Sequence, residues 1–339
     1  ELVQHYGVTA VLCTATQPAL GKLFRELAPT LVQHEIAPDP DELFDCFHRV
    51  SFCREGVFTP EKLAERLTET AQVLCIVNTR KRARQVYESL PEEGRFHLST
   101  LMIPTDREKT LNAIRTRLQN GKTCRVVSTS LVEAGVDVDF PSVWRELAGL
   151  DSILQAAGRC NREGRRSAAE SVVHVFEAEG GVQEEIEKRQ NATKSVIDKF
   201  LDFNTRTAIQ AYFKRLFILE GSDFLDNEKI LEKERARMFQ ETAGKLQIID
   251  KKGAYIVYIP DEENEEDITL LRTKQYSRKL FRRLGKCSVN VHQNDFNAMV
   301  LNGAIEDYRR DGFGILIKKN EYSPLSGLKT DSEDSFISS

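Results

Sequence analysis

Three polar side chains at helical spacing form the most chemically suggestive group in the chain. Gln155, Arg159 and Arg162 lie at positions i, i+4 and i+7 of one stretch, so a helix there would place them on one face beside Gly158. A guanidinium keeps its proton and offers five donors in a planar fork. Two arginines one turn apart can therefore neutralise the charge that develops as a γ-phosphate leaves. A solvated basic helix is the alternative interpretation.

A second polar segment lies just upstream of this stretch. It begins at residue 126 as a short apolar run rich in β-branched residues, and this run predicts a strand. The strand would deliver a loop of polar and small residues, namely Ser128, Thr129, Glu133, Gly135 and Asp137. Two of these also have ordinary interpretations, because Gly135 suits any turn and Glu133 suits a helix surface.

In their order along the chain, the two segments resemble motifs V and VI of superfamily 2 helicases. The resemblance implies the second RecA-like domain of such an enzyme, which ends with a strand, a Ser/Thr loop, Gly-x-Asp, a strand and a Gln-x-x-Gly-Arg-x-x-Arg helix. It implies the following roles: Arg162 as the arginine finger on the γ-phosphate of ATP, Arg159 as a second phosphate contact, Gln155 as a nucleotide or coupling contact, Gly135 and Asp137 at the nucleotide with Asp137 toward the ribose, and Ser128 and Thr129 on the nucleic-acid backbone.

Near its start, the chain reads as a buried strand, 7–18, that ends in Thr14, Ala15 and Thr16 and is stopped by Pro18. This segment resembles motif III, which closes the first RecA-like domain and implies a coupling role for the three residues. The sequence contains no Gly-x-x-x-x-Gly-Lys-Ser/Thr loop and no Asp-Glu-x-His strand end. We therefore expect the chain to be part of a larger helicase whose first lobe holds the ATP phosphates and the ligands of Mg²⁺.

The segment between these motifs alternates helix and strand signals. Thr59 and Pro60 predict the start of a helix, and the apolar run 73–78 predicts the strand that follows. Helix followed by strand implies a parallel α/β sheet. The residues at the end of this strand, Asn78, Thr79 and Arg80, resemble motif IV and imply contact with DNA. The basic run 80–84 suits a solvated helix equally well.

A weaker resemblance follows at 97–100 and 104–107. These segments are similar to motif IVa of the family, in which an arginine corresponding to Arg107 has a functional role. An arginine that caps a helix is the alternative interpretation.

The predicted fold class is α/β, with a RecA-like parallel-sheet lobe followed by a smaller α+β accessory domain. We expect four strand and helix units in the lobe, and strands at 246–250, 254–259 and 312–317 in the accessory domain. The predicted boundaries are 1–20 for the end of the first lobe, 21–48 for a linker, 49–180 for the second lobe, 181–240 for a helical connector, 241–330 for the accessory domain and 331–339 for a disordered tail.

The particular residues within these motifs resemble those of one family of superfamily 2 helicases. The runs 13–18, 130–141 and 155–164 are similar to those of the CRISPR-associated helicase-nuclease of type I systems, and the tail runs 312–317 and 322–328 resemble its type I-C branch. In that family an HD phosphohydrolase domain cuts single-stranded DNA with metal ions, and two RecA-like lobes reel in the strand by ATP hydrolysis after a Cascade complex has marked the target. The HD metals and the Walker lysine match no position in this sequence.

The resemblance implies a 3′ to 5′ translocase whose partners are single-stranded DNA, Cascade, the upstream half of the polypeptide and phage inhibitor proteins. Two other interpretations stay open. One is a superfamily 2 motor of DNA repair or RNA metabolism, and the other is a non-catalytic module that binds DNA or Cascade.

A basic segment near the C-terminus offers a second DNA contact. Residues 272–286 contain no acid and follow the acidic run 261–267. As a helix, the segment would turn Tyr276, Leu280 and Leu284 toward the core, and Arg278 and Arg282 would form one wall of a groove for single-stranded DNA. A surface helix paired with the acidic run is the alternative.

Composition is compatible with these interpretations without choosing among them. The 339 residues carry a formal net charge of −4 and are 29% charged and 40% hydrophobic, which is ordinary for a globular chain of two domains. The charge argues against a uniformly basic nucleic-acid coat. Seven scattered cysteines without a C-x-x-C pair, a signal peptide or a long apolar span indicate a reducing cytoplasm and no membrane partner.

One cluster of potential metal ligands lies near the linker. His34, Cys46, His48 and Cys53 are close in sequence, but their spacing matches no common structural zinc site. Packing of the linker is the favoured interpretation, and no metal site is predicted in this chain.

Overall fold

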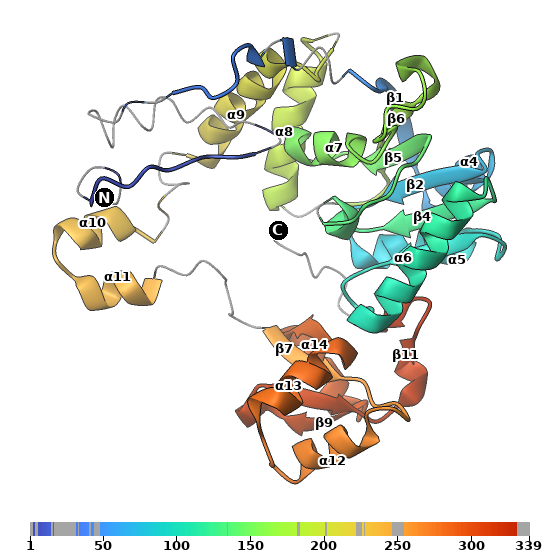
Figure 1. Cartoon of the computed structure of the whole chain (residues 1–339), viewed down its shortest axis with the longest axis vertical. Helices are drawn as coiled ribbons and strands as arrows, with labels where there is room; N and C mark the ends of the chain where they lie inside the picture. Colours follow the sequence, from blue (N-terminus) through green and yellow to red (C-terminus); the bar gives the residue numbers. More distant parts are fainter. Residues whose placement is uncertain are drawn as a thin grey trace.

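The computed structural model describes most of the chain from residue 48 onward. The described ranges are 48–133, 135–181, 184–200, 202–221, 226, 228–245 and 254–330, together with residues 3, 6–14, 16, 32, 34–40 and 42–43. A larger lobe built on one sheet precedes a smaller domain, which lies beneath it in Figure 1.

The lobe is built on a six-stranded, all-parallel sheet. Its spatial order is β1-β6-β5-β2-β4-β3. The strands are β1 (Ser51–Phe58), β2 (Gln72–Ile76), β3 (Arg95–Leu98), β4 (Cys124–Ser128), β5 (Ser142–Glu146) and β6 (Val172–Ala178). This sheet confirms the predicted α/β class. It contains more strands than the four predicted units, because the edge strands β1 and β3 are polar or short and lack the apolar run that marks a buried strand.

Helices cover both faces of the sheet. They are α4 (Pro60–Thr68), α5 (Arg80–Ser89), α6 (Pro104–Gln119) and α7 (Leu150–Ala157), with the short 3₁₀ turns η1 (Ser130–Val132) and η2 (Ala168–Glu170). Alternate side chains of β2 enter two different cores. Val73 and Cys75 pack with α4 and α5, whereas Leu74 and Ile76 pack with Ile114 of α6. The predicted helix start is confirmed, since Thr59 caps α4 by accepting from the Lys62 amide at 3.3 Å.

Packing of the lobe continues beyond residue 180. Helices α8 (Glu184–Ile197) and α9 (Arg206–Glu220) share a core with α7, and the hydroxyl of Tyr212 donates to Asp151 at 2.9 Å. Two short helices follow, α10 (Ile230–Arg235) and α11 (Phe239–Lys245). No helix in the described part of the chain is both long and apolar enough to cross a membrane.

The small domain has a mixed sheet of order β8-β7-β10-β9, in which β7 is parallel to β10 and antiparallel to β8. Its elements are β7 (Ala254–Tyr258), α12 (Glu265–Arg272), α13 (Arg278–Leu284), η4 (Gly285–Cys287), β8 (Ser288–His292), α14 (Gln293–Leu301), β9 (Ile305–Tyr308), η5 (Arg309–Asp311), β10 (Phe313–Leu316), η6 (Lys319–Glu321), β11 (Tyr322–Ser323) and β12 (Gly327–Leu328). The predicted α+β class of the domain and its strands near 254 and 312 are confirmed.

The two domains share a specific contact at the start of α6. Leu101 and Ile103 belong to the hydrophobic core of the small domain. The hydroxyl of Tyr322 accepts from the Ile103 amide at 3.1 Å and donates to Asp106 at 2.8 Å. Gly327, at φ +80°, passes so close that a Cβ there would lie 2.6 Å from the Leu101 carbonyl oxygen. The small domain is therefore fixed against the lobe.

One strand prediction is wrong. Residues 7–14 form no strand, and Val11 and Leu12 expose 68% and 70% of their surface. A parallel strand buried on both faces needs neighbouring strands for its backbone hydrogen bonds, and none pairs with this segment among the described residues. The predicted strand 246–250, the tail 331–339 and most of the linker 21–48 lie outside the described residues.

Candidate functional site

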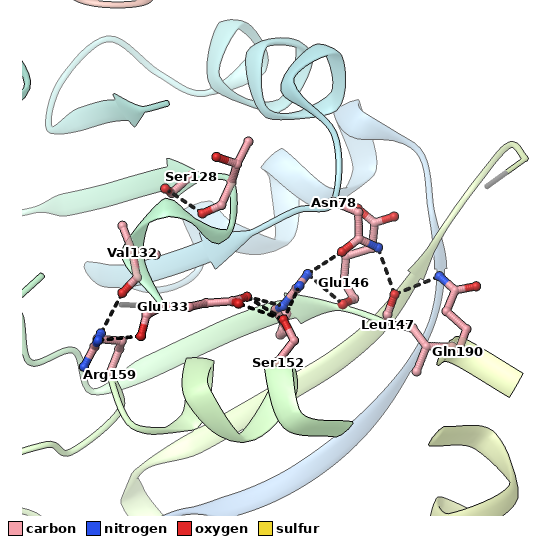
Figure 2. Close-up of polar contacts among 11 residues, drawn as sticks. Asn78, Ser128, Val132, Glu133, Glu146, Leu147, Ser152, Arg159 and Gln190 are labelled. Atoms are coloured by element: carbon pink, nitrogen blue, oxygen red, sulfur yellow. Dashed lines mark hydrogen bonds and ion pairs between the residues drawn. The ribbon is translucent and has the colours of Figure 1, made fainter. Parts of the chain in front are cut away.

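A polar network occupies the carboxyl ends of three neighbouring strands of the lobe. Asn78 follows β2, Arg145 and Glu146 end β5, and Glu133 lies on the loop after β4 (Figure 2). In open parallel sheets, this edge is where ligand-binding loops gather.

Arg145 is the centre of this network. Its guanidinium donates from Nη1 to Asn78 Oδ1 at 2.6 Å and from Nη2 to Ser152 Oγ at 2.8 Å, and its Nε lies 3.0 Å from Glu133 Oε1. The side chains of Arg145 and Glu133 are only 3% and 7% exposed. Because a buried charge is costly without a partner, this pair holds β5, α7 and the loop after β4 in one arrangement.

Burial raises the pKa of the Glu133 carboxyl, while the positive charge of Arg145 and the hydroxyl of Ser152 oppose the rise. The Ser152 hydroxyl donates to the carboxylate at 2.8 Å. The carboxylate is therefore held by contacts from two different elements, β5 and α7. Glu133 is not the surface acid that one interpretation of the sequence suggests.

A second buried carboxylate extends the network to α5. Glu146, whose side chain is 1% exposed, pairs with Arg82 at 2.5 Å and accepts from the backbone N–H of Asn78 at 2.8 Å. The Leu147 carbonyl accepts from Asn78 Nδ2 at 2.9 Å and from Gln190 Nε2 of α8 at 2.8 Å. Helices α5 and α8 therefore both form polar contacts with the end of β5, through Glu146 and Leu147.

The prediction that Gln155, Arg159 and Arg162 share one helix face is wrong. Helix α7 ends at Ala157, and the chain then leaves the helix to form a bridge between Cys160 and Phe140. The Phe140 amide donates to the Arg159 carbonyl at 3.0 Å. Of the three side chains, only that of Gln155 lies on the helix, where it is half-buried.

Arg159 points into the lobe. Its Nε and Nη2 donate to the carbonyls of Val132 and Glu133 at 2.7 and 2.6 Å, and the residue is 8% exposed. Burial lowers the pKa of its guanidinium, with a further contribution from the nearby charge of Arg162. In this structure Arg159 therefore joins the turn after α7 to the loop after β4, and two of its guanidinium nitrogens donate to backbone carbonyls.

Arg162, in contrast, has a fixed backbone and an accessible side chain. Its amide donates to Asp139 Oδ1 at 2.7 Å, and its carbonyl accepts from Arg49 at 2.6 Å. Its Nε lies 3.0 Å from the Asp137 carboxylate, and the two side chains are 42% and 80% exposed. Gly135, two residues before Asp137, has a φ of +71° and open space around it.

Ser128, for which the family resemblance implies a contact with DNA, has a buried side chain. The residue is fully buried, and its hydroxyl donates to the carbonyls of Leu98 and Thr129 at 3.0 and 2.9 Å. Ser128 ends the interior strand β4 between β2 and β3, so its side chain faces protein. Thr129 is 4% exposed, and its hydroxyl has no hydrogen-bond partner among the described residues.

Asn78, Thr79 and Arg80, which follow β2, also bind other protein groups. Both ends of the Asn78 amide belong to the network, and Thr79 caps α5 by accepting from the Arg82 amide at 3.1 Å. Arg80 donates to Thr100 at 3.1 Å. Burial lowers the pKa of the Arg80 guanidinium, and Asp295 of the small domain opposes the shift, so Arg80 lies where the domains meet.

In the basic segment 272–286, some arginines are exposed and another is paired with an acidic residue of the neighbouring helix. Arg278 and Arg282 of α13 are exposed, whereas Arg283 donates to Asp267 of α12 at 2.7 Å. Leu280 and Leu284 are buried as predicted. Tyr276 is not, because the helix begins at residue 278 and leaves this ring 37% exposed.

A cavity of about 240 Å³ lies beside the motif V loop, lined by Leu98, Arg107, Leu111, Leu131, Gly135 and Val136. Arg107 is half-buried and lines this cavity as the fourth residue of α6, whose N-cap is Ile103, so Arg107 is not a helix cap. Thr14 forms only a local turn, since its hydroxyl donates to the Thr16 carbonyl at 3.0 Å. Ala15 lies outside the described residues.

The sequence reasoning missed the centre of the network. Arg145 and Glu146 end a strand that begins with Ser142, Val143 and Trp144, and two adjacent charges directly after two large apolar residues were the available signal. Arg82 and Ser152 gave no signal, because a helix surface readily accommodates either residue. The one Gly-Lys-Thr triplet of the chain, 121–123, follows a helix and precedes a strand, which is the reverse of the order in a phosphate-binding loop.

Part of the chain is similar to a known protein family. Residues 69–165 match the family described as "CRISPR-associated nuclease/helicase Cas3, C-terminal". A protein of that name from Methanothermobacter thermautotrophicus is 25% identical over 295 residues, which cover 77% of this chain and 34% of the relative. The chain thus spans about a third of the length of this relative.

Solved structures support the same fold. The crystal structure of T. fusca Cas3 with ADP aligns with a TM-score of 0.54 and 15% identity, over 88% of this chain and 44% of that one. A chain of a structure described as "CRISPR RNA-guided surveillance complex, pre-nicking" aligns with a TM-score of 0.50 and 13% identity, over 90% of this chain and 46% of that one. At these identities the likeness concerns the fold alone.

Proposed function

We propose that this chain, whose matched region is that of the C-terminal part of Cas3 nuclease/helicases, is the second half of an ATP-dependent single-stranded DNA translocase. In the complete protein, the translocase would feed an attached nuclease during type I CRISPR interference. Resemblance of the tail runs favours the I-C branch, and resemblance of the motifs favours 3′ to 5′ movement.

The observation that carries the proposal is the position of Arg162. Its backbone is held by Asp139 and Arg49, while its side chain pairs, among the residues that the structure describes, only with the exposed carboxylate of Asp137. An exposed ion pair of this kind contributes about 0–1 kcal/mol. A γ-phosphate offers a guanidinium stronger, charge-assisted hydrogen bonds, so it can take Arg162 from Asp137 at little cost. An arginine finger requires such an exchange of a weak resting partner for the γ-phosphate.

The geometry also favours a link between Arg162 and the motif V loop. Arg159 binds the carbonyls of Val132 and Glu133, three and two residues before Gly135. Asp137 continues the same loop. Movement of Arg162 toward a nucleotide would therefore release Asp137 and alter a loop that Arg159 anchors. We assign Gln155 and Gly135 to this coupling, with Gly135 supplying the backbone freedom that a positive φ allows.

An arginine finger acts on a phosphate that another lobe holds. The 339 residues contain no phosphate-binding loop of the Gly-x-x-x-x-Gly-Lys-Ser/Thr type, so ATP and its Mg²⁺ would be bound by a first RecA-like lobe. We therefore expect the isolated chain to hydrolyse no ATP above background. Robust turnover by this chain alone would contradict the proposal.

Contact with DNA is assigned to the small domain. Arg278 and Arg282 lie one turn apart on the exposed face of α13, and they would contact the phosphates of a single strand without reading its bases. Cascade would deliver that strand, and the nuclease metals would lie in an HD domain of the complete protein. Phage inhibitor proteins are further partners that the family resemblance suggests.

The test is reconstitution with a first-lobe polypeptide, followed by DNA-stimulated ATP hydrolysis. Arg162→Ala should reduce the rate roughly 10³-fold or more while leaving single-stranded DNA affinity unchanged, as expected for an arginine finger. Arg165→Ala is the matched control, because this arginine is 74% exposed and pairs with its neighbour Glu163. Equal losses in both variants would refute the assignment. Stimulation by RNA and not by DNA would favour a different superfamily 2 motor.

A binding module is the second candidate function for the isolated chain. It is favoured by Arg278, Lys279 and Arg282, which are exposed and form no salt bridge within the described part of the structure. Silence in ATP hydrolysis even after reconstitution, together with salt-dependent binding of single strands, would support this candidate.

A further inference from the structure

Three potential metal ligands gather on the outer edge of the lobe sheet, away from the strand ends that carry the polar network. Cys53 and Glu55 come from β1, and His174 comes from β6. Their sulfur, oxygen and nitrogen atoms all lie within 4.8 Å of one another. The sequence gave no sign of this group, because 119 residues separate Glu55 from His174.

Strand pairing brings the group together. In the parallel register of β1 and β6, Cys53 lies opposite His174. Residues two apart on a strand face the same side, so Glu55 joins Cys53 and His174 on one face. A break in the register between Arg54 and Val57 lies at Glu55. On the opposite face, Arg54 pairs with Asp198, the residue that follows α8, at 2.9 Å.

The ligand atoms are partly shielded and well held. His174 Nδ1 lies 2.7 Å from Glu55 Oε1, and these side chains are 21% and 17% exposed. The imidazole stacks on Trp144 of β5, with ring centroids 4.5 Å apart and an interplanar angle of 14°. The ring orientation is therefore set by the core. Cys53 is exposed and leaves one side of the group open to water.

The donor set matches a particular class of ion. A thiolate, a carboxylate and an imidazole are the ligands of borderline divalent ions, with zinc foremost, and zinc binds them at about 2.0–2.3 Å. The two anionic ligands would neutralise the charge of the ion. Without a metal, burial and the negative charge of Glu55 raise the pKa of the Cys53 thiol. A divalent cation would reverse that electrostatic effect and favour the thiolate.

We propose that Cys53, Glu55 and His174 form a binding site for a divalent ion of the zinc class, with water as the fourth ligand. The ion would take the place of the direct contact between Glu55 and His174 and would cross-link the edge strand β1 to β6. Among the described residues β1 pairs with no other strand, so the ion would stabilise the edge at which the lobe begins. The site shares no residue with the finger or the network, so its existence is independent of the proposed function.

The experiment uses the whole 339-residue chain, freed of metal with a chelator and titrated with Zn²⁺ against a chromophoric competitor. One tightly bound equivalent is expected. Replacement by Co²⁺ should give the near-ultraviolet charge-transfer band of a cobalt–thiolate bond. Zn²⁺ should also raise the unfolding midpoint, because a ligand that binds only the folded state stabilises it.

Variants decide whether the three residues bind the ion. Cys53→Ser should abolish the cobalt–thiolate band and weaken Zn²⁺ binding at least tenfold, and Glu55→Gln should weaken it while keeping a hydrogen-bonding side chain next to His174. Two controls are matched. Cys13→Ser removes another exposed thiol, and His48→Gln removes a surface histidine that pairs with Asp202 at 2.8 Å.

Both controls should bind Zn²⁺ like the parent chain. The proposal is overturned if the parent chain binds no equivalent of Zn²⁺, or if Cys53→Ser keeps both the stoichiometry and the band. If Cys53→Ser fails to fold, Glu55→Gln and the cobalt spectrum of the parent chain decide the question.

Discussion

Removal of the Glu133 carboxylate is predicted to destabilise the lobe more than any surface substitution. In Glu133→Ala, the buried guanidinium of Arg145 loses the only carboxylate with which it forms an ion pair in the described structure, at 3.0 Å. Ser152 loses the acceptor of its hydroxyl at the same time. Breaking one side of a buried pair costs about 3–5 kcal/mol. At about 2–4 °C per kcal/mol for a domain of the lobe's size, the unfolding midpoint of the lobe should fall by about 10 °C.

The assay is denaturant unfolding followed by a double-mutant cycle. Arg145→Met removes the other charge, and the double variant should be more stable than Glu133→Ala alone, because no unpaired buried charge is left. Glu163→Ala is the control, since that acid is 48% exposed and should change stability by less than about 0.5 kcal/mol. A loss below about 1 kcal/mol in Glu133→Ala would refute the account of the network as the structural centre of this edge.

Three further predictions concern other parts of the chain. Replacing Arg278 and Arg282 together by Ala should weaken single-strand binding and lower the log–log salt slope by about 1.4 in fluorescence titrations, whereas Arg283, already paired with Asp267, should matter less. His97 is buried, and desolvation lowers the pKa of its imidazole from 6.5 to about 4. The unfolded chain therefore takes up a proton at this residue before the folded chain does, and the stability contributed by the neutral imidazole is complete only above pH 6.5. That stability, about 3 kcal/mol, is lost as the pH falls from 6.5 to 4, and the pH dependence of unfolding should flatten in His97→Gln. Gly327→Ala should loosen the contact between the domains because of its close approach to Leu101, which limited proteolysis would detect as faster cleavage between them; an unchanged pattern would count against a rigid contact.

The central strands and the helix start were predictable because their signals are local. The strands β2 and β4 are buried on both faces, and their sequences are apolar runs that only an interior parallel strand needs. Thr59 and Pro60 mark a helix start through the chemistry of the first turn. The edge strands were harder to recognise, since half-exposed strands carry no such run.

The order of the motifs along the chain located the site, but it did not orient the side chains. Helical spacing suggested one face for Arg159 and Arg162, yet the helix ends between Gln155 and Arg159 because the bridge between Phe140 and Cys160 redirects the chain. Whether an arginine faces a phosphate or a carbonyl depends on that bridge. No local sequence pattern predicts the bridge between Phe140 and Cys160.

The sequence by itself determined the class of fold, the succession of strands and loops, and the family resemblance. Tertiary structure alone decided that Ser128 is buried, that Arg145 joins three strand ends, and that Cys53 meets His174. The physical reason is that these contacts depend on the register between parallel strands far apart in sequence. The pattern of one strand indicates which face is buried, but the strand with which it pairs is decided by the packing of the whole sheet, as the pairing of β1 with β6 shows.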